Sequence, residues 1–188
     1  KLEKNRYWIS IADSDVIYYF KGLAEGMGLN VNIFEPDVNI LSIQGPKSKI
    51  LIEKMFGKEI SELKFFRHGK VNFNGKEMIV ARSGWSHQMC YEVYVDGSEY
   101  GQEMWDKFFS IGKDFDVRAG CPNLIERIES GLLSYGNDIN GNNTPYEAGL
   151  GKFLSSGVSK GCLAYEILQS KMEPQRLIKP IEITGEPI

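Results

Sequence analysis

The chain is most constrained by a predicted strand, turn and second strand near its middle. Residues 78–81 are an apolar run that favours β structure, and residues 91–95 are rich in aromatic and β-branched side chains. Side chains alternate between the two faces of a strand, so Glu92 and Tyr94 share one face, about 7 Å apart along the strand. The opposite face carries Tyr91, Val93 and Val95. The pattern predicts a strand with one apolar face and one face that bears a carboxylate beside a phenol.

Trp85 lies in the turn between these two predicted strands. Viewed alone, the hairpin has an ordinary interpretation, because most antiparallel sheets expose one polar face to solvent. Glu92 would then be a solvated carboxylate, Tyr94 a rim residue and Trp85 a half-buried ring. A functional interpretation needs support from the rest of the chain.

Composition and charge describe an ordinary globular protein. The 188 residues are 42% hydrophobic and 25% charged, and the formal net charge of −3 argues against a partner nucleic acid held through its phosphates. No apolar run is long enough to span a membrane. Two histidines, His68 and His87, have no carboxylate at metal-ligand spacing, so no metal site is predicted.

The three cysteines, Cys90, Cys121 and Cys162, are far apart and form no CxxC pair. This usage favours reduced thiols in a cytoplasmic protein over a disulfide framework. Cys90 and Cys121 are interpreted as small buried hydrophobic residues. The chain starts without Met and stops just after a strand-like run at residues 178–183, so we expect a fragment of a longer protein.

The remaining pattern favours an α+β fold, with an antiparallel sheet and helices packed on it, because strands and helices show no regular βαβ alternation. Strands are expected at residues 7–11, 31–34, 38–43, 71–73, 77–82, 91–95, 115–117 and 178–183. Helices are expected at about residues 16–27, 48–56, 98–111, 122–133 and 163–170. Asn74-Gly75 predicts a two-residue hairpin turn, and residues 136–145 a long loop of the kind that often carries function. Core side chains are expected at Trp105, Phe108, Leu124, Ile125, Ile128 and Leu132.

Four motifs in order resemble the folate-dependent aminomethyltransferase family, typified by the T-protein of the glycine cleavage system. They are Leu41-Ser-Ile-Gln-Gly-Pro-Lys-Ser48, Arg82-Ser-Gly-Trp-Ser86 with Tyr91-Glu-Val-Tyr94, Arg127-Ile-Glu-Ser-Gly-Leu-Leu-Ser-Tyr-Gly-Asn-Asp138, and Thr144-Pro-Tyr-Glu-Ala-Gly-Leu150. The segment around Trp8 and the Gly84-Trp-Ser-His-Gln88 turn look more like one branch, the tetrahydrofolate-dependent dimethylsulfoniopropionate demethylases. The motifs cover roughly residues 40–152.

The resemblance implies a three-lobed ring around a central folate hole. Residues 1–36 would end the first lobe, residues 37–154 would form the second α+β lobe with a folate-facing hairpin, and residues 155–188 would be a linker and the start of a C-terminal β-barrel lobe. The catalytic aspartate of T-proteins would lie outside this chain, so no catalytic residue is assigned. Arg127 and Glu129 are interpreted as an exposed helix pair, and Asp138 would either face the central hole or fix its loop.

The resemblance also implies the site residues. The family's folate-gripping glutamate falls on Glu92, with Tyr94 and Trp85 as further contacts to tetrahydrofolate, the methyl acceptor. A sulfonium substrate needs π faces for its recognition, and Trp85, Tyr94 and Trp8 are the candidates.

The first function hypothesis is therefore methyl transfer from dimethylsulfoniopropionate to tetrahydrofolate. Two alternatives stay open, a glycine-cleavage-type aminomethyltransferase and a non-catalytic folate-binding module. The expected partners are small-molecule substrates, without nucleic acid or membrane, and a homodimer stays open as the assembly.

Overall fold

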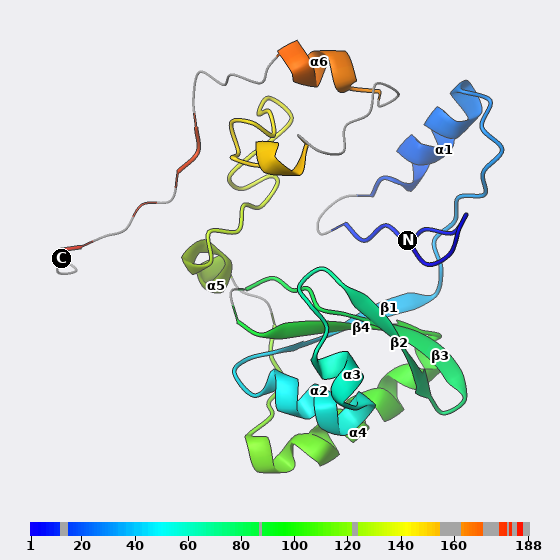
Figure 1. The fold of residues 1–188 in the computed structure, drawn as a ribbon, viewed down its shortest axis with the longest axis vertical. Helices are drawn as coiled ribbons and strands as arrows, with labels where there is room; N and C mark the ends of the chain where they lie inside the picture. Colours follow the sequence, from blue (N-terminus) through cyan, green and yellow to red (C-terminus); the bar gives the residue numbers. More distant parts are fainter. Residues whose placement is uncertain are drawn as a thin grey trace. The chain divides into compact units, whose positions relative to one another are not determined.

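The computed structural model describes residues 1–11, 15–86, 88–121, 124–154, 163–170, 177–179, 181 and 184–185. The chain divides into two compact units, Lys1–Cys121 and Pro122–Ile188, which are described separately (Figure 1). The division into three lobes that the resemblance implies stays a prediction.

The first unit is built on a four-stranded antiparallel sheet. Its strands are β1 (Val38–Gln44), β2 (His68–Phe73), β3 (Lys76–Ala81) and β4 (Cys90–Asp96). Their order is β1-β4-β3-β2, so β4 is hydrogen-bonded on both sides. The turn between β2 and β3 has positive φ at both Asn74 (51°) and Gly75 (84°), the geometry that matches the twist of a tight hairpin. The α+β class and this hairpin turn were both predicted.

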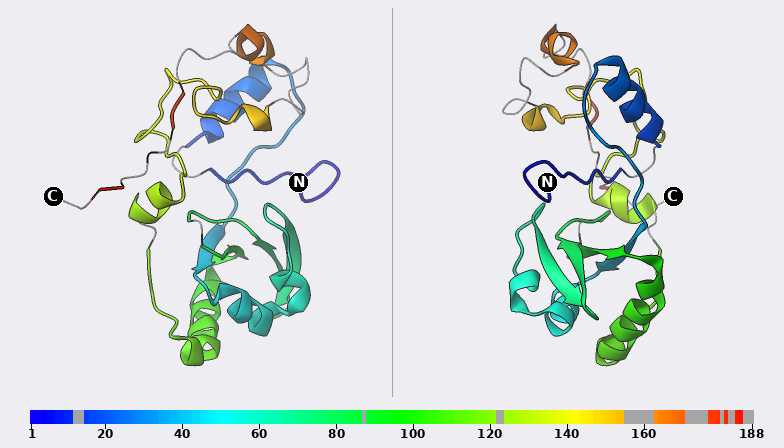
Figure 2. Two further views of the ribbon diagram at one scale, coloured as in Figure 1. Left: turned by 60° about the vertical axis from the view of Figure 1, so that its left-hand side comes forward. Right: turned by 90° about the vertical axis from the view of Figure 1, so that its right-hand side faces the viewer.

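Helices cover one face of this sheet (Figures 1 and 2). They are α2 (Ser48–Phe56), α3 (Lys58–Ser61), η1 (Ser98–Tyr100), α4 (Gly101–Gly112) and η2 (Lys113–Phe115). The core between helices and sheet consists of Leu51, Ile52, Ile60, Val71, Phe73, Met78, Val80, Tyr91, Val93, Val95, Met104 and Phe108. The Tyr91 hydroxyl donates to the Ser61 carbonyl at 2.6 Å, which satisfies the one polar atom of a fully buried ring. The apolar face of β4 is therefore the face that the helices cover, and its other face is free to carry a site.

Several predicted elements of the first unit are wrong. Residues 7–11 and 31–34 form no strand, because neither segment pairs with another strand among the described residues, and β propensity needs such a partner. Residues 115–117 form no strand either. Asp116 takes a left-handed φ of 59° and ends η2. The predicted core residue Trp105 is 38% exposed, whereas Phe108 is buried as expected. Helix α1 (Ile17–Gly26) confirms the prediction for that stretch.

The described residues of the second unit form three short helices. Its helices are α5 (Leu124–Glu129), η3 (Gly151–Phe153) and α6 (Tyr165–Ser170). Helix α5 ends before the predicted residue 133, because Gly131 turns the chain with φ 66° and the Leu132 amide bonds back to the Arg127 carbonyl at 2.9 Å.

The predicted core face of this helix is also wrong, since its apolar side chains are largely exposed. These are Leu124 (54%), Ile125 (69%) and Ile128 (61%). The predicted loop at 136–145 holds no helix or strand beyond one isolated bridge. The predicted strand at 178–183 lies partly outside the described residues. Among the helices that the structure describes, none has the length and apolar character that crossing a membrane requires.

Candidate functional site

Glu92 stands on the sheet face that the helices leave uncovered. Its cross-strand neighbours are Ser42 on β1 and Ala81 on β3, both with small side chains. Because β4 is paired on both sides, the backbone that carries Glu92 is fixed, and the short neighbours leave room above the sheet for a ligand. The half-buried carboxylate therefore has a rigid base and an open approach.

Ser83 is a contact that the sequence alone did not reveal. It lies two residues beyond the end of β3, and its hydroxyl donates a hydrogen bond to Oε2 of Glu92. Ser83 is the sole hydrogen-bond donor to Glu92 in the described part of the chain. The second carboxylate oxygen can therefore accept from a ligand. The signal in the sequence was the Arg82-Ser-Gly-Trp motif itself, in which the serine precedes the tryptophan by two residues.

Tyr94 shares the uncovered face with Glu92, as predicted, and it is joined there by Trp8. The two rings have centroids 5.9 Å apart and planes inclined by 39°. Burial raises the pKa of the Tyr94 phenol, and a hydrogen bond with the Ser10 side chain partly opposes that shift. The phenol therefore stays protonated at neutral pH and serves as a hydrogen-bonding and apolar surface.

The turn that carries Trp85 packs closely against Cys90. A Cβ at Gly84 would lie 2.3 Å from the Cys90 Sγ, so only glycine lets the turn approach β4 this closely. The backbone of Trp85 hydrogen bonds to the same sulfur, and the Ser42 hydroxyl lies 3.4 Å from it. Burial raises the pKa of the Cys90 thiol, which makes it a packing residue and a poor nucleophile.

The far end of the same turn is anchored to the β1–α2 connection. The amide of Gly45 donates to the Met89 carbonyl at 2.9 Å, and the Ser48 hydroxyl donates to it at 2.8 Å. The Ser86 hydroxyl reaches Gln44 Oε1 at 3.3 Å. The Gln44–Ser48 motif thus holds in place a turn that lies some forty residues later in the chain. Trp85 itself is half-buried.

The cysteines differ in their exposure. Cys121 is exposed, so its interpretation as a buried small hydrophobic residue is wrong, whereas that of Cys90 is confirmed. Cys162 lies outside the described residues. No group of three metal-ligating side chains occurs among the residues for which the structure gives positions.

Two exposed aromatic rings, Phe65 and Phe66, lie beside the start of this turn. Their centroids are 4.1 Å apart, and they are 60% and 68% exposed. Phe66 has a left-handed φ of 58°, and its amide donates to the Arg82 carbonyl at 2.9 Å. A non-glycine residue held in this conformation next to Ser83 is the kind of local strain that gathers at binding sites.

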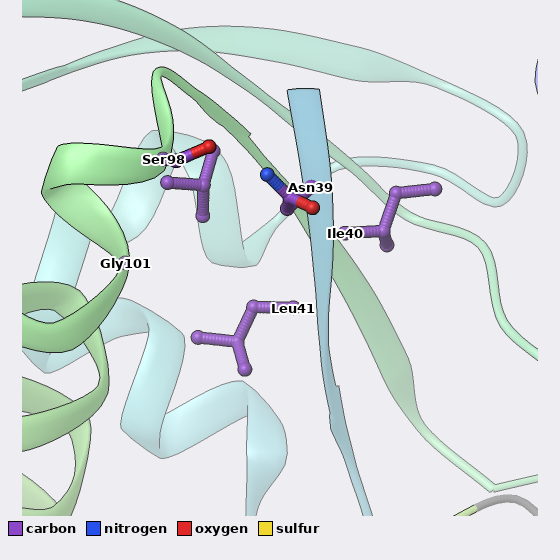
Figure 3. Close-up of a pocket in the computed structure, with 6 residues that line it drawn as sticks. Asn39, Ile40, Leu41, Ser98 and Gly101 are labelled. Atoms are coloured by element: carbon purple, nitrogen blue, oxygen red, sulfur yellow. The ribbon is translucent and has the colours of Figure 1, made fainter. Parts of the chain in front are cut away.

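A cavity of about 320 Å³ lies elsewhere in the first unit, between β1 and the start of α4. Figure 3 shows its lining residues, with Ile40 and Leu41 pointing to opposite sides of the strand. The adjacent Asp37 carboxylate accepts hydrogen bonds from the Ser98 amide, at 2.8 Å, and from its hydroxyl. The Asp37 carboxylate is thus already bonded to Ser98, the first residue of η1, and it is not a ligand-binding group of this cavity.

In the second unit, Arg127 is buried rather than exposed, and its ion-pair partner is Asp138, not Glu129. The exposed Arg127–Glu129 pair that the sequence suggested is therefore wrong. Arg127 Nη1 donates to Asp138 Oδ2 at 2.5 Å and to the Leu132 carbonyl at 3.1 Å, and the Ser134 amide donates to the same Asp138 oxygen at 2.8 Å. Of the two roles left open for Asp138, the structure shows the loop-fixing one.

The uncovered face of the first unit thus gathers Glu92, Tyr94 and Trp8, with the turn of Trp85 at its edge. A carboxylate whose two oxygens keep acceptor positions suits a flat ring with two neighbouring N–H donors, since each oxygen can accept from one of them. The aromatic faces suit an apolar or cationic group. The described residues of this arrangement are suited to binding and orientation.

Comparison with protein families matches residues 1–157 to the family described as the GCVT N-terminal domain. The chain is 48% identical over 189 residues to the dimethylsulfoniopropionate demethylase DmdA of Ruegeria pomeroyi, covering 99% of this chain and 51% of that protein. It is 29% identical over 161 residues to an aminomethyltransferase of Caldanaerobacter subterraneus, covering 82% of this chain and 42% of that protein. An aminomethyltransferase of Thermoanaerobacter pseudethanolicus is 31% identical over 138 residues, with coverages of 71% and 36%.

Among solved structures, the chain resembles the glycine cleavage system aminomethyltransferase T from Bartonella henselae. The TM-score is 0.63 at 20% identity, over 83% of this chain and 44% of that one. This likeness confirms the fold class. The chain spans about half the length of the curated relatives that it matches.

Proposed function

The chain belongs to the family of the GCVT N-terminal domain, and on this basis we propose that it is part of a tetrahydrofolate-dependent methyltransferase. The reaction is transfer of a methyl group from dimethylsulfoniopropionate to N5 of tetrahydrofolate, which gives methylmercaptopropionate and 5-methyltetrahydrofolate. The observation that carries this proposal is the 48% identity to a dimethylsulfoniopropionate demethylase along 99% of the chain. The aminomethyltransferase relatives reach 29% and 31% over shorter stretches.

In this proposal Glu92 orients the folate. The pterin ring presents an exocyclic amine and a ring N–H side by side, and a carboxylate can accept both in a charge-assisted pair of hydrogen bonds. The donor from Ser83 engages Oε2 and leaves acceptor positions for this pair. The small side chains of Ser42 and Ala81 on either side support the fit, because a flat ring can approach the sheet above them.

The aromatic residues recognise the methyl donor. A sulfonium is a cation that forms no strong hydrogen bonds, and an aromatic face attracts such a group by roughly 0.5–2 kcal/mol, depending on desolvation. Trp8 and Tyr94 lie ring against ring on the open face, and Trp85 stands in the turn beside Cys90. Tyr94 and Trp85 contact folate as well in this assignment.

The proposed reaction requires the protein to align the two substrates more than to transfer a proton. A sulfonium methyl is displaced in line, and the leaving group is a neutral thioether that needs no protonation. Catalysis would then come from holding the two substrates at reacting distance and from excluding water. This fits a site whose described residues offer a fixed carboxylate and ring faces. The free thiols of Cys90 and Cys121 favour a reducing compartment, so we place the enzyme in the cytoplasm.

Aminomethyl transfer is the second candidate, and the observation that favours it is the set of aminomethyltransferase relatives. A non-catalytic folate-binding module is the third. The deciding experiment incubates the full-length gene product with tetrahydrofolate and dimethylsulfoniopropionate that carries deuterated methyl groups. Mass spectrometry should find deuterated 5-methyltetrahydrofolate together with methylmercaptopropionate. Folate binding without either product would contradict the proposal and favour one of the alternatives.

Tetrahydrofolate binding to variants of the full-length gene product tests the folate site. Glu92→Gln removes the charge but keeps the shape of the side chain. It should weaken tetrahydrofolate binding about tenfold or more, because a hydrogen bond to a charged group contributes more free energy than one to a neutral group. Glu103→Gln, at an exposed position of α4, is the matched control and should bind normally. Normal folate affinity in the Glu92 variant would remove this residue from the site.

A further inference from the structure

We propose that Ser83 is the positioning residue of the folate site, because its hydroxyl fixes the orientation of the Glu92 carboxylate. The inference rests on the proposed function and deepens it at the same site. Ser83 belongs to the turn after β3, whereas Glu92 belongs to β4, so the bond joins the turn to the strand. Ser83 would act on the substrate only through Glu92.

Glu92 needs such a partner because no other hydrogen bond holds its side chain among the residues that the structure describes. A glutamate side chain has three rotatable bonds and loses much rotamer freedom when it is ordered. The neighbours across the sheet give it no hydrogen bond. Ala81 has no polar atom, and the hydroxyl of Ser42 lies in contact with the Cys90 sulfur at 3.4 Å. Ser83 is the donor that remains.

The position of Ser83 is itself fixed by the contact of its turn with β4. The adjacent Gly84 packs directly on Cys90, where a Cβ would come within 2.3 Å of Sγ and 2.4 Å of Cβ. The other end of the turn is tied to β1 and α2 through the Met89 carbonyl, which accepts from Gly45 and Ser48. A turn pinned at both ends presents the Ser83 hydroxyl at a fixed height above the sheet, and this height sets the position of the carboxylate.

A carboxylate that is ordered before binding should raise folate affinity, because the ligand does not have to order it. The effect should appear in the dissociation constant and KM for tetrahydrofolate. It should be absent from the KM for the methyl donor, which Glu92 does not contact in this assignment.

The test is a double-mutant cycle in the full-length gene product, with tetrahydrofolate binding measured by calorimetry. Ser83→Ala should weaken binding about tenfold, and Ser83→Thr, which keeps the hydroxyl, should restore it to within about twofold. In the Glu92→Gln background, Ser83→Ala should cause no further loss, since the two residues act as one unit. Ser110→Ala, at an exposed position of α4, is the matched serine control.

Other outcomes would overturn the inference. They are normal folate affinity in Ser83→Ala, independent losses from the two substitutions, or a loss that follows a fall in the unfolding temperature. Calorimetry needs no methyl donor, so the two proposals can fail separately. A non-additive cycle without product formation would keep the role of Ser83 and reject demethylation. Product formation with an additive cycle would keep demethylation and reject the role of Ser83. A wild-type protein that binds no tetrahydrofolate would reject both proposals.

Discussion

The indole of Trp8 lies against the phenol ring of Tyr94, with 5.9 Å between the ring centroids. This contact brings the start of the chain to the interior strand of the sheet. It also contributes to the burial that keeps the Tyr94 phenol protonated. An aromatic surface beside Glu92 is therefore assembled from two segments that are distant in the sequence.

Trp85→Ala should affect the two substrates unequally. If the indole faces the sulfonium, its loss should raise the KM for dimethylsulfoniopropionate about tenfold and leave tetrahydrofolate binding within about threefold of normal. Trp105→Ala is the control, because Trp105 lies on α4 against Phe109, outside the site. Steady-state kinetics with each substrate varied in turn would measure both effects. Equal losses for the two ligands would count against the assigned role.

Asp138→Asn should destabilise the second unit by about 3 kcal/mol, because it leaves the charge of Arg127 buried without its partner. The Arg127 side chain is 4% exposed and that of Asp138 31%, which places the effect at the low end for a buried pair. Asp116→Asn is the control, since its ion pair with Arg118 is 73–78% exposed and should contribute little. Chemical denaturation and limited proteolysis would compare the two. Equal effects would show that the Arg127 pair does not fix the loop.

Gly84→Ala should disturb the turn, because its new Cβ would overlap Cys90. We expect a cost of roughly 1–3 kcal/mol in unfolding free energy, as for other overpacked sites. Cys90→Ala should give no relief, since the Cβ of residue 90 also lies 2.4 Å from the new atom. Cys90→Gly should recover part of the loss in the double variant. Gly120→Ala, which has open space around it, is the control and should change nothing. A Gly84→Ala variant of normal stability would contradict the close seating of the turn.

Asp37 should contribute to acid sensitivity. Hydrogen bonds from the side chain and then the backbone of Ser98 hold the pKa of Asp37 below its ordinary value of 3.8. A carboxyl whose pKa is lowered on folding stabilises the protein above its ordinary pKa, and this stabilisation is lost as the pH falls through the lowered value. Asp37→Asn should therefore be less stable than wild type near pH 6, and the difference should shrink as the pH falls below 3.8. Urea unfolding at a series of pH values would measure this, and a constant difference across the range would contradict it.

The sequence predicted the sheet well because its signals were local and regular. Alternation in residues 91–95 assigned the two faces of β4, and the Asn74-Gly75 turn assigned the β2–β3 hairpin. The predictions failed where structure depends on distant partners. Residues 7–11 have strand composition, yet they contact β4 through side chains, with Trp8 packed on Tyr94 and Ser10 hydrogen-bonded to it. The helix expected at residues 122–133 ends at Glu129, because Gly131 and the Arg127–Asp138 pair end it early.

At the candidate site, too, local patterns could be predicted and contacts between distant segments could not. The shared face of Glu92 and Tyr94 could be predicted from alternation alone. The hydrogen bond from Ser83 could not, because it depends on how far the turn folds back over β4. That distance is set by the contact between Gly84 and Cys90, which no local pattern in the sequence indicates.

The interior place of β4 has a consequence for how such a fold can change its specificity. The carboxylate stands on a strand that is paired on both sides and can loosen only when the whole sheet opens. Of the rings around it, Tyr94 belongs to the same strand, whereas Trp8 lies in the N-terminal segment and Trp85 in a turn, where substitutions disturb the sheet least. Under the proposed function, a related protein could therefore accept a different methyl donor through changes at Trp8 and Trp85, while Glu92 and its strand keep the folate.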